Sequence, residues 1–192
     1  MTQDDRRTIA GYAERLESVY KSSSAKERHE GKLWYEQANA ECRKIAKEHG
    51  FAVKRVCYAT AAVSNNKQWE ANVNLIDNIA YAVKNGLEPY GHFATLLDKA
   101  VRILRDGDFK ALSGPKVIPF ARAIYRPHSS AAVIDRWMAR AAGLDTRLTP
   151  AKLRFIQTAL RRVARKVRRP VSDVQAIVWI AIRNQAANPL PF

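Results

Sequence analysis

The chain has 192 residues, of which 33 are Lys or Arg and 18 are Asp or Glu, so its formal net charge is +15. A soluble domain usually carries a net charge of about 2 to 8, so this excess indicates a polyanionic partner, most simply a nucleic acid. The hydrophobic fraction of 47% is enough for a packed core, which excludes a chain that is disordered throughout.

Neither a membrane span nor secretion is expected from the sequence. The longest stretch without a charged residue, 56–66, is much shorter than the roughly 20 apolar residues that cross a bilayer. The charged N-terminal residues 1–7 have no apolar segment behind them, so no signal peptide is predicted. We therefore expect a cytoplasmic protein.

No cofactor or metal is expected either. Cys42 and Cys57 are the only cysteines, too few for a Cys₄ metal site, and a reducing cytosol would keep them as thiols. The histidines show no metal-ligand spacing; they are His29, His49, His92 and His128.

Hydrophobic residues recur at helical spacing along the chain while alternating strand patterns are weak, so we predict an all-α fold. A polar, serine-bearing segment at 21–31 is expected to be a flexible link. The predicted helices span residues 5–20, 32–48, 53–63, about 67–86, 92–105, 116–125, 136–142 and 150–168, and a last helix follows Ser172 as its cap.

Local signals define several helix ends. Asp135 stands where an N-cap is expected, and Thr149 is an N-cap followed by Pro150 at the first helical position. Residues 105–116 are predicted as a tight turn and a short segment between two helices.

One lysine and one aspartate are candidates for catalysis. Lys116 follows a Gly-Pro turn at a helix start, where free backbone N–H groups and the helix dipole can hold a phosphate. Asp135 follows 19 residues later. On this spacing alone, a solvated lysine and an ordinary aspartate cap are the simpler interpretation.

Three segments, in chain order, resemble the helix-hairpin-helix DNA glycosylases, most closely the branch of 8-oxoguanine DNA glycosylases with abasic-site (AP) lyase activity. Ser-Asn-Asn at 64–66 is similar to that branch's loop, and Gly-Pro-Lys-Val at 114–117 is similar to the end of its hairpin. Gln-Ala-Ile-Val-Trp at 175–179 resembles its C-terminal helix. The resemblance covers roughly residues 55–185.

The resemblance implies a role for each matching residue. Lys116 would attack the sugar C1′ and form a Schiff base, and Asp135 would stabilise the positive charge that develops on the sugar. The other roles would be a base pocket of Phe120, Gln175 and Trp179, and DNA contacts by Asn65, Asn66 and Gly114.

The same resemblance implies a glycosylase-like fold of two helical lobes with a central cleft, in a single domain over 1–192. Its expected parts are an N-terminal helix and link (1–31), a lobe with the hairpin and the catalytic residues (32–145), and a basic helix with the base-reading C-terminal helix (146–192).

Several of these residues have an alternative structural interpretation. Asn65 and Asn66 would also serve as caps of the helix that follows them. Trp179 would also serve as a core residue of an apolar helix.

The positive charge is concentrated near the C-terminus, where residues 147–169 hold nine basic residues and no acidic one. A long helix with a solvated basic face is one interpretation. The other is a stripe that follows the DNA backbone, because four of the arginines fall on one side of the predicted helix. They are Arg154, Arg161, Arg165 and Arg168.

The leading hypothesis is a DNA-repair enzyme that flips a damaged purine out of double-stranded DNA and excises it through a lysine Schiff base, with 8-oxoguanine as the best guess. The resemblance implies a monomer without a membrane partner. It also implies association with the nucleoid of a bacterium, an archaeon or a phage-infected cell. Two alternatives stay open: a phage base-modification enzyme on the same fold, and a non-catalytic basic DNA-binding protein.

Overall fold

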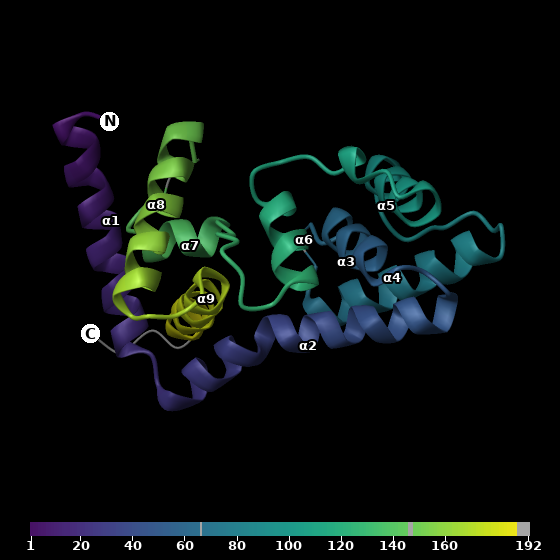
Figure 1. Cartoon of the computed structure of the whole chain (residues 1–192), viewed down its shortest axis with the longest axis horizontal. Coiled ribbons are helices and arrows are strands. Elements are labelled where there is room, and N and C mark those ends of the chain that lie inside the picture. Colours follow the sequence, from purple (N-terminus) through teal and green to yellow (C-terminus); the bar gives the residue numbers. More distant parts are fainter. Residues whose placement is uncertain (66, 146–147, 188–192) are drawn as a thin grey trace. The chain divides into compact units, whose positions relative to one another are not determined.

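The computed structural model describes residues 1–65, 67–145 and 148–187, and within these residues it is built from helices without strands (Figure 1). The all-α prediction is confirmed. No helix in the described part of the chain has the length and apolarity to cross a membrane. The elements are α1 (Gln3–Ser22), α2 (Ala25–His49), α3 (Val53–Ala62), α4 (Trp69–Lys84), α5 (Ala94–Asp106), η1 (Phe109–Ala111), α6 (Val117–Tyr125), α7 (Arg136–Ala141), α8 (Pro150–Lys166) and α9 (Val171–Ala187).

The chain forms two compact units, and it leaves the first and later returns to it. Unit 1 comprises residues 1–35 and 128–192, and unit 2 comprises residues 36–127, so that one boundary falls inside α2. The sequence prediction instead placed its divisions after residues 31 and 145.

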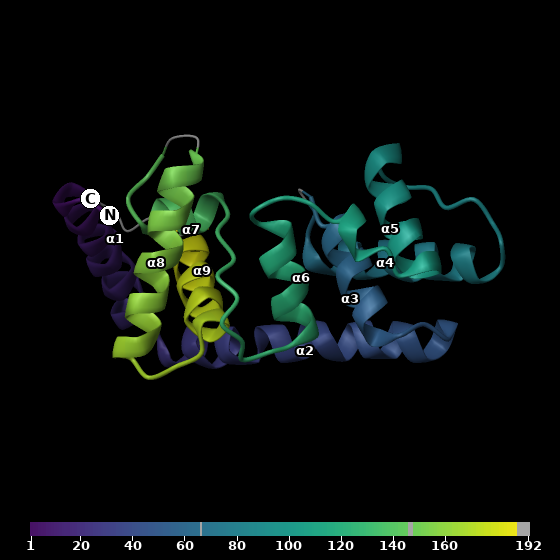
Figure 2. The same ribbon diagram turned by 45° about the horizontal axis from the view of Figure 1, so that its top comes forward.

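Unit 1 is a group of helices around one apolar core. Figure 2 shows α8 beside both α1 and α9, and α7 packs against α9 as well. The apolar faces of these helices meet because each repeats hydrophobic residues at helical spacing. The largest side chains of this core include Leu16, Met138, Ile156, Leu160 and Ile177.

The N-terminal part of α2 crosses α9 at a glycine. A Cβ atom placed on Gly31 would lie 2.6 Å from the Cα of Ile177, closer than real side chains approach. Only glycine allows the two helix backbones to come this close.

Unit 2 is organised around α3, against which α4, α5 and α6 all pack (Figure 1). The second half of α2 joins this core through side chains: the Asn39 amide donates to the carbonyl oxygen of Ile124 at 2.9 Å. The core includes Val56, Ile76, Ile79, Ile103, Leu104 and Ile124, and the free cysteines Cys42 and Cys57 are also buried.

The expected flexible link at 21–31 is wrong, because α1 runs to Ser22 and α2 begins at Ala25. Ser24 and Glu27 explain the early start. The Ser24 backbone N–H donates to the Glu27 carboxylate at 2.7 Å, and the Glu27 N–H donates to the Ser24 hydroxyl at 3.2 Å. This reciprocal capping box satisfies free donors at the helix start, so a polar segment can be helical without an apolar face.

The C-terminal end of α8 differs from the prediction too. The helix ends at Lys166, and Arg168 lies beyond it with a left-handed backbone (φ 53°). The Arg169 N–H then donates back to the Ala164 carbonyl at 3.0 Å, which is the pattern of a Schellman cap. Ser172 is not a cap: α9 begins before it, and its hydroxyl accepts from the Ser129 N–H at 2.9 Å.

The connection between α5 and α6 is more elaborate than a tight turn. Gly107 ends α5 in the left-handed region (φ 68°), and the η1 turn follows, with Asp108 accepting from the Lys110 N–H at 3.1 Å. Both α5 and α6 pack on α3. The predicted turn and short segment between two helices are therefore confirmed, and the short segment is the η1 turn.

Candidate active site and nucleic-acid interface

Asp135 forms the N-cap of α7, as its place in the sequence predicted. One carboxylate oxygen accepts from the backbone N–H groups of Trp137 and Met138, both at 3.0 Å. These are two of the donors that a helix start leaves free, so the carboxylate is fixed in orientation by the backbone.

The second carboxylate oxygen of Asp135 accepts from the indole N–H of Trp179, which comes from α9, at 2.9 Å. The structure thus brings together two predicted site residues that lie 44 positions apart in the sequence. The indole ring is also covered by the guanidinium of Arg183, 4.3 Å from the ring centroid, and meets the edge of Trp34 at 6.2 Å. Trp179 is half-buried. It is therefore not a fully buried core residue, and its ring is not fully open for stacking either.

Gln175 lies one turn before Trp179 on α9 and is buried, with 5% of its surface exposed. Its side-chain oxygen accepts from the hydroxyl of Tyr35 at 2.7 Å. Burial raises the pKa of Tyr35, and the nearby negative charge of Asp135 raises it further, so this hydroxyl stays a hydrogen-bond donor. The bond holds the Gln175 amide in one orientation.

An open hollow of about 390 Å³ lies beside Asp135 in unit 1. Its charged lining includes Arg136 and Arg140 on α7, and both guanidinium groups lie over the ring of Trp137, 5.8 and 4.9 Å from its centroid. Asp145 lines the hollow as well, and its carboxylate pairs with Arg140 at 3.8 Å. The lining therefore holds two carboxylates and two arginines, which can meet a developing cation or a phosphate.

Lys116 belongs to unit 2, where it is the N-cap of α6. Gly114 precedes it in the left-handed region (φ 111°). The Lys116 carbonyl accepts from the Phe120 N–H at 3.1 Å, so these two residues lie one turn apart on one side of α6, both half-buried. In the described part of the chain, no carboxylate lies within ion-pair distance of the Lys116 amine.

The Ser64–Asn65 segment ends α3 rather than starting α4. The N-cap of α4 is Gln68, so Asn65 does not cap this helix, and its side chain is exposed. His92 lies beside this segment. Burial lowers the pKa of its imidazole and the charge of Lys67 lowers it further, whereas a hydrogen bond with the Val63 backbone raises it. Asn66 lies outside the described residues.

The basic stripe on α8 is exposed along the helix. Arg154, Arg161 and Arg165 are all exposed, and no carboxylate among residues 1–65, 67–145 and 148–187 pairs with them. Lys166, on the same helix, does pair with Glu17 at 2.7 Å. The opposite face is buried, as predicted, through Ile156, Leu160 and Val163.

Sequence reasoning missed two neighbours of this site, Trp34 and Tyr35 on α2. Their signal was a pair of aromatic residues in an otherwise polar segment, but nothing in the sequence connected them with Trp179. Arg183, whose guanidinium covers the Trp179 ring, had no role assigned either.

One group in the described part of the chain combines histidine and carboxylates closely enough to hold a metal: Glu48, His49 and Asp77 in unit 2. None of the three is a predicted site residue.

Comparison with known proteins gives one family match, which covers residues 1–186 and is described as "Family of unknown function (DUF7178)". The chain belongs to this family. The region matched to DUF7178 includes Lys116, Asp135, Gln175 and Trp179. No curated protein and no solved structure matched the chain.

Proposed function

We propose that this protein is a DNA glycosylase with AP lyase activity, acting on a damaged purine in double-stranded DNA, with 8-oxoguanine as the first substrate to test. The observation that carries the proposal is the 2.9 Å hydrogen bond between Asp135 and Trp179. The resemblance assigned these residues separately, one to catalysis and one to the base pocket, and spacing gave no reason for them to meet.

The proposed reaction begins at the Lys116 amine. Its nitrogen forms a bond to C1′ as the C1′–N glycosidic bond breaks, and the leaving base takes the electron pair and a proton. The sugar ring then opens as its oxygen leaves C1′ as a hydroxyl group, which gives a protonated imine. Loss of a proton from C2′ and departure of the 3′ phosphate cut the strand.

Asp135 would act through its charge in this reaction. A carboxylate held by two backbone N–H groups and an indole N–H is preorganised, so it needs no rearrangement to stabilise positive charge on the sugar. Trp179 and the buried Gln175 amide would bound the space for the base.

The DNA backbone would contact the exposed arginines of α8. Arg154, Arg161 and Arg165 recur at helical spacing and lack carboxylate partners in the described part of the chain, so their charge is available for phosphates. The N-terminus of α6 adds little to this contact, because the Ile118 N–H already donates to the Gly114 carbonyl at 3.3 Å and Pro119 has no N–H.

Borohydride trapping tests the proposal. The full chain would be mixed with duplexes that contain 8-oxoguanine, other purine lesions or an abasic site, and reduced, so that any imine becomes a stable amine. We expect a covalent adduct with the wild type and its loss in Lys116→Gln. Lys110→Gln, an exposed lysine on η1, is the matched control and should still be trapped. The absence of an adduct across the panel would overturn the enzymatic proposal.

A second candidate is a DNA-binding protein without turnover. It is favoured by the fact that both Asp135 oxygens already accept hydrogen bonds from the chain itself, which a purely structural aspartate would also do. Steeply salt-dependent DNA binding that Asp135→Asn leaves unchanged, together with intact DNA strands, would select this candidate.

A further inference from the structure

We propose that Glu48, His49 and Asp77 form a structural site for a divalent transition-metal ion, with Zn²⁺ as the best-matched ion. The proposal is independent of the DNA chemistry proposed for this protein. The three residues come from two helices of unit 2: Glu48 and His49 end α2, and Asp77 lies within α4.

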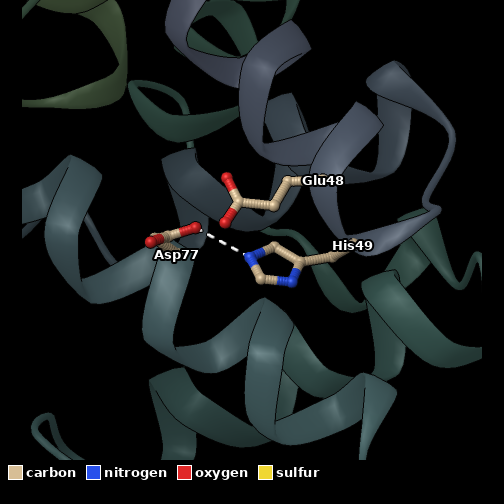
Figure 3. Close-up of side chains that lie close together, drawn as sticks. All are labelled: Glu48, His49 and Asp77. Carbon is tan, nitrogen blue, oxygen red and sulfur yellow. Dashed lines mark hydrogen bonds and ion pairs between the residues drawn. The ribbon is translucent and has the colours of Figure 1, made fainter.

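The three side chains converge on one point. Figure 3 shows the Glu48 carboxylate turned toward the other two groups, and one ligand atom from each residue lies within 4.8 Å of the others. The closest approach joins His49 Nε2 to an oxygen of Asp77 at 2.8 Å. Ligand atoms around a tetrahedral zinc ion lie about 3.3 Å apart, given metal–ligand bonds of about 2.0 Å. The His49–Asp77 contact would open slightly, and Glu48 would move inward on its flexible side chain.

The charge of the cluster favours a cation. Two carboxylates, those of Glu48 and Asp77, lie close together. Within the described residues, no cation pairs with the Glu48 carboxylate. The amine of Lys84 does reach this corner, but it donates to the Glu48 backbone carbonyl at 3.2 Å. A metal ion would therefore reduce the electrostatic repulsion between the Glu48 and Asp77 carboxylates.

The cluster joins one buried imidazole to two carboxylates that reach the surface, since Glu48 is exposed. The His49 side chain is 7% exposed and that of Asp77 is 44% exposed. The edge-on ring of Tyr81 lies 6.3 Å from the imidazole. One imidazole nitrogen and two carboxylate oxygens form a ligand set that suits zinc, with one coordination position left for water. The metal would tie the end of α2 to α4.

Calorimetric titration of the chelator-stripped full chain with Zn²⁺ tests the site, with thermal unfolding as a second readout. We expect the wild type to bind one Zn²⁺ at this site and to unfold at a higher temperature when the ion is present. Glu48→Gln removes one ligand and leaves the His49–Asp77 bond untouched, so it should weaken this binding at least about tenfold and abolish the thermal shift.

Glu41→Gln is the matched control, because Glu41 is an exposed glutamate on the same helix outside the cluster. It should bind zinc as the wild type does. Asp77→Asn should weaken binding as Glu48→Gln does. Zinc binding that is absent from the wild type, or equal in the wild type and Glu48→Gln, would overturn the proposal.

Discussion

At the scale of single residues, Asp135 combines a structural task with the proposed catalytic one. Its carboxylate caps α7 and accepts from the Trp179 indole. Substitutions can separate these tasks, because asparagine caps helices about as well as aspartate but carries no charge.

We predict that Asp135→Ala lowers the free energy of unfolding by about 2 to 4 kcal/mol, since it removes the cap and leaves the indole donor without its acceptor. Asp135→Asn should lower it by about 1 kcal/mol. Both variants should lose base excision. Urea denaturation and single-turnover excision measure the two effects, and wild-type excision by Asp135→Asn would contradict the catalytic role.

Arg168 allows a test of DNA binding without loss of stability. Its backbone is left-handed, a conformation that costs a non-glycine residue about 1 kcal/mol or more. We predict that Arg168→Gly keeps or raises the thermal unfolding temperature while it weakens DNA binding. If one phosphate contact is lost, the slope of log affinity against log salt concentration should decrease in magnitude by about 0.9. Unchanged affinity would place Arg168 outside the interface.

At the scale of elements, the crossing of α2 and α9 depends on one glycine. A Cβ at Gly31 would meet the backbone of Ile177, whereas a Cβ at Gly11 on α1 would meet no atom within 4 Å. The two positions form a natural pair for comparison.

We predict that Gly31→Ala lowers the free energy of unfolding by about 1 to 3 kcal/mol through overpacking. Gly11→Ala should raise it by about 0.5 to 1 kcal/mol, because alanine has the higher helix propensity. Chemical denaturation of both variants measures the difference, and equal effects would show that the crossing does not require glycine.

The helices themselves could be predicted from the sequence wherever an apolar face exists. Periodicity located α1, α3 and α8, and the Thr149-Pro150 signal gave the start of α8. It failed over 21–31 because a capping box there stabilises a polar helix, which periodicity does not register. It also extended α8 too far, because the Schellman cap at Arg168 uses an arginine where glycine is usual.

The candidate site could be predicted only in part. Asp135 as an N-cap follows from local sequence, but its bond to Trp179 depends on how α7 and α9 pack. Likewise, His49 and Asp77 are 28 positions apart, so the spacing of histidines alone could not reveal their cluster with Glu48.

At the scale of the whole molecule, the net charge of +15 is unevenly distributed. The exposed face of α8 gathers Arg154, Arg161 and Arg165, which lack carboxylate partners in the described part of the chain. The placement of the charge, rather than its total, should therefore determine DNA affinity.

We predict that the triple variant Arg154→Gln, Arg161→Gln, Arg165→Gln weakens duplex binding by more than tenfold at moderate salt. A control with the same net charge replaces the exposed Arg6, Lys44 and Lys47 by Gln and should bind nearly as the wild type does. Fluorescence anisotropy over a range of salt concentrations compares them, and equal losses would mean that only total charge matters.

Peptide mapping of the borohydride-reduced protein–DNA adduct by mass spectrometry identifies the nucleophile itself. After nuclease and protease digestion, we expect one modified peptide, with the sugar remnant on the side-chain nitrogen of Lys116. A remnant on another lysine or on the N-terminal amine, or an absence of any modified peptide, would contradict this expectation.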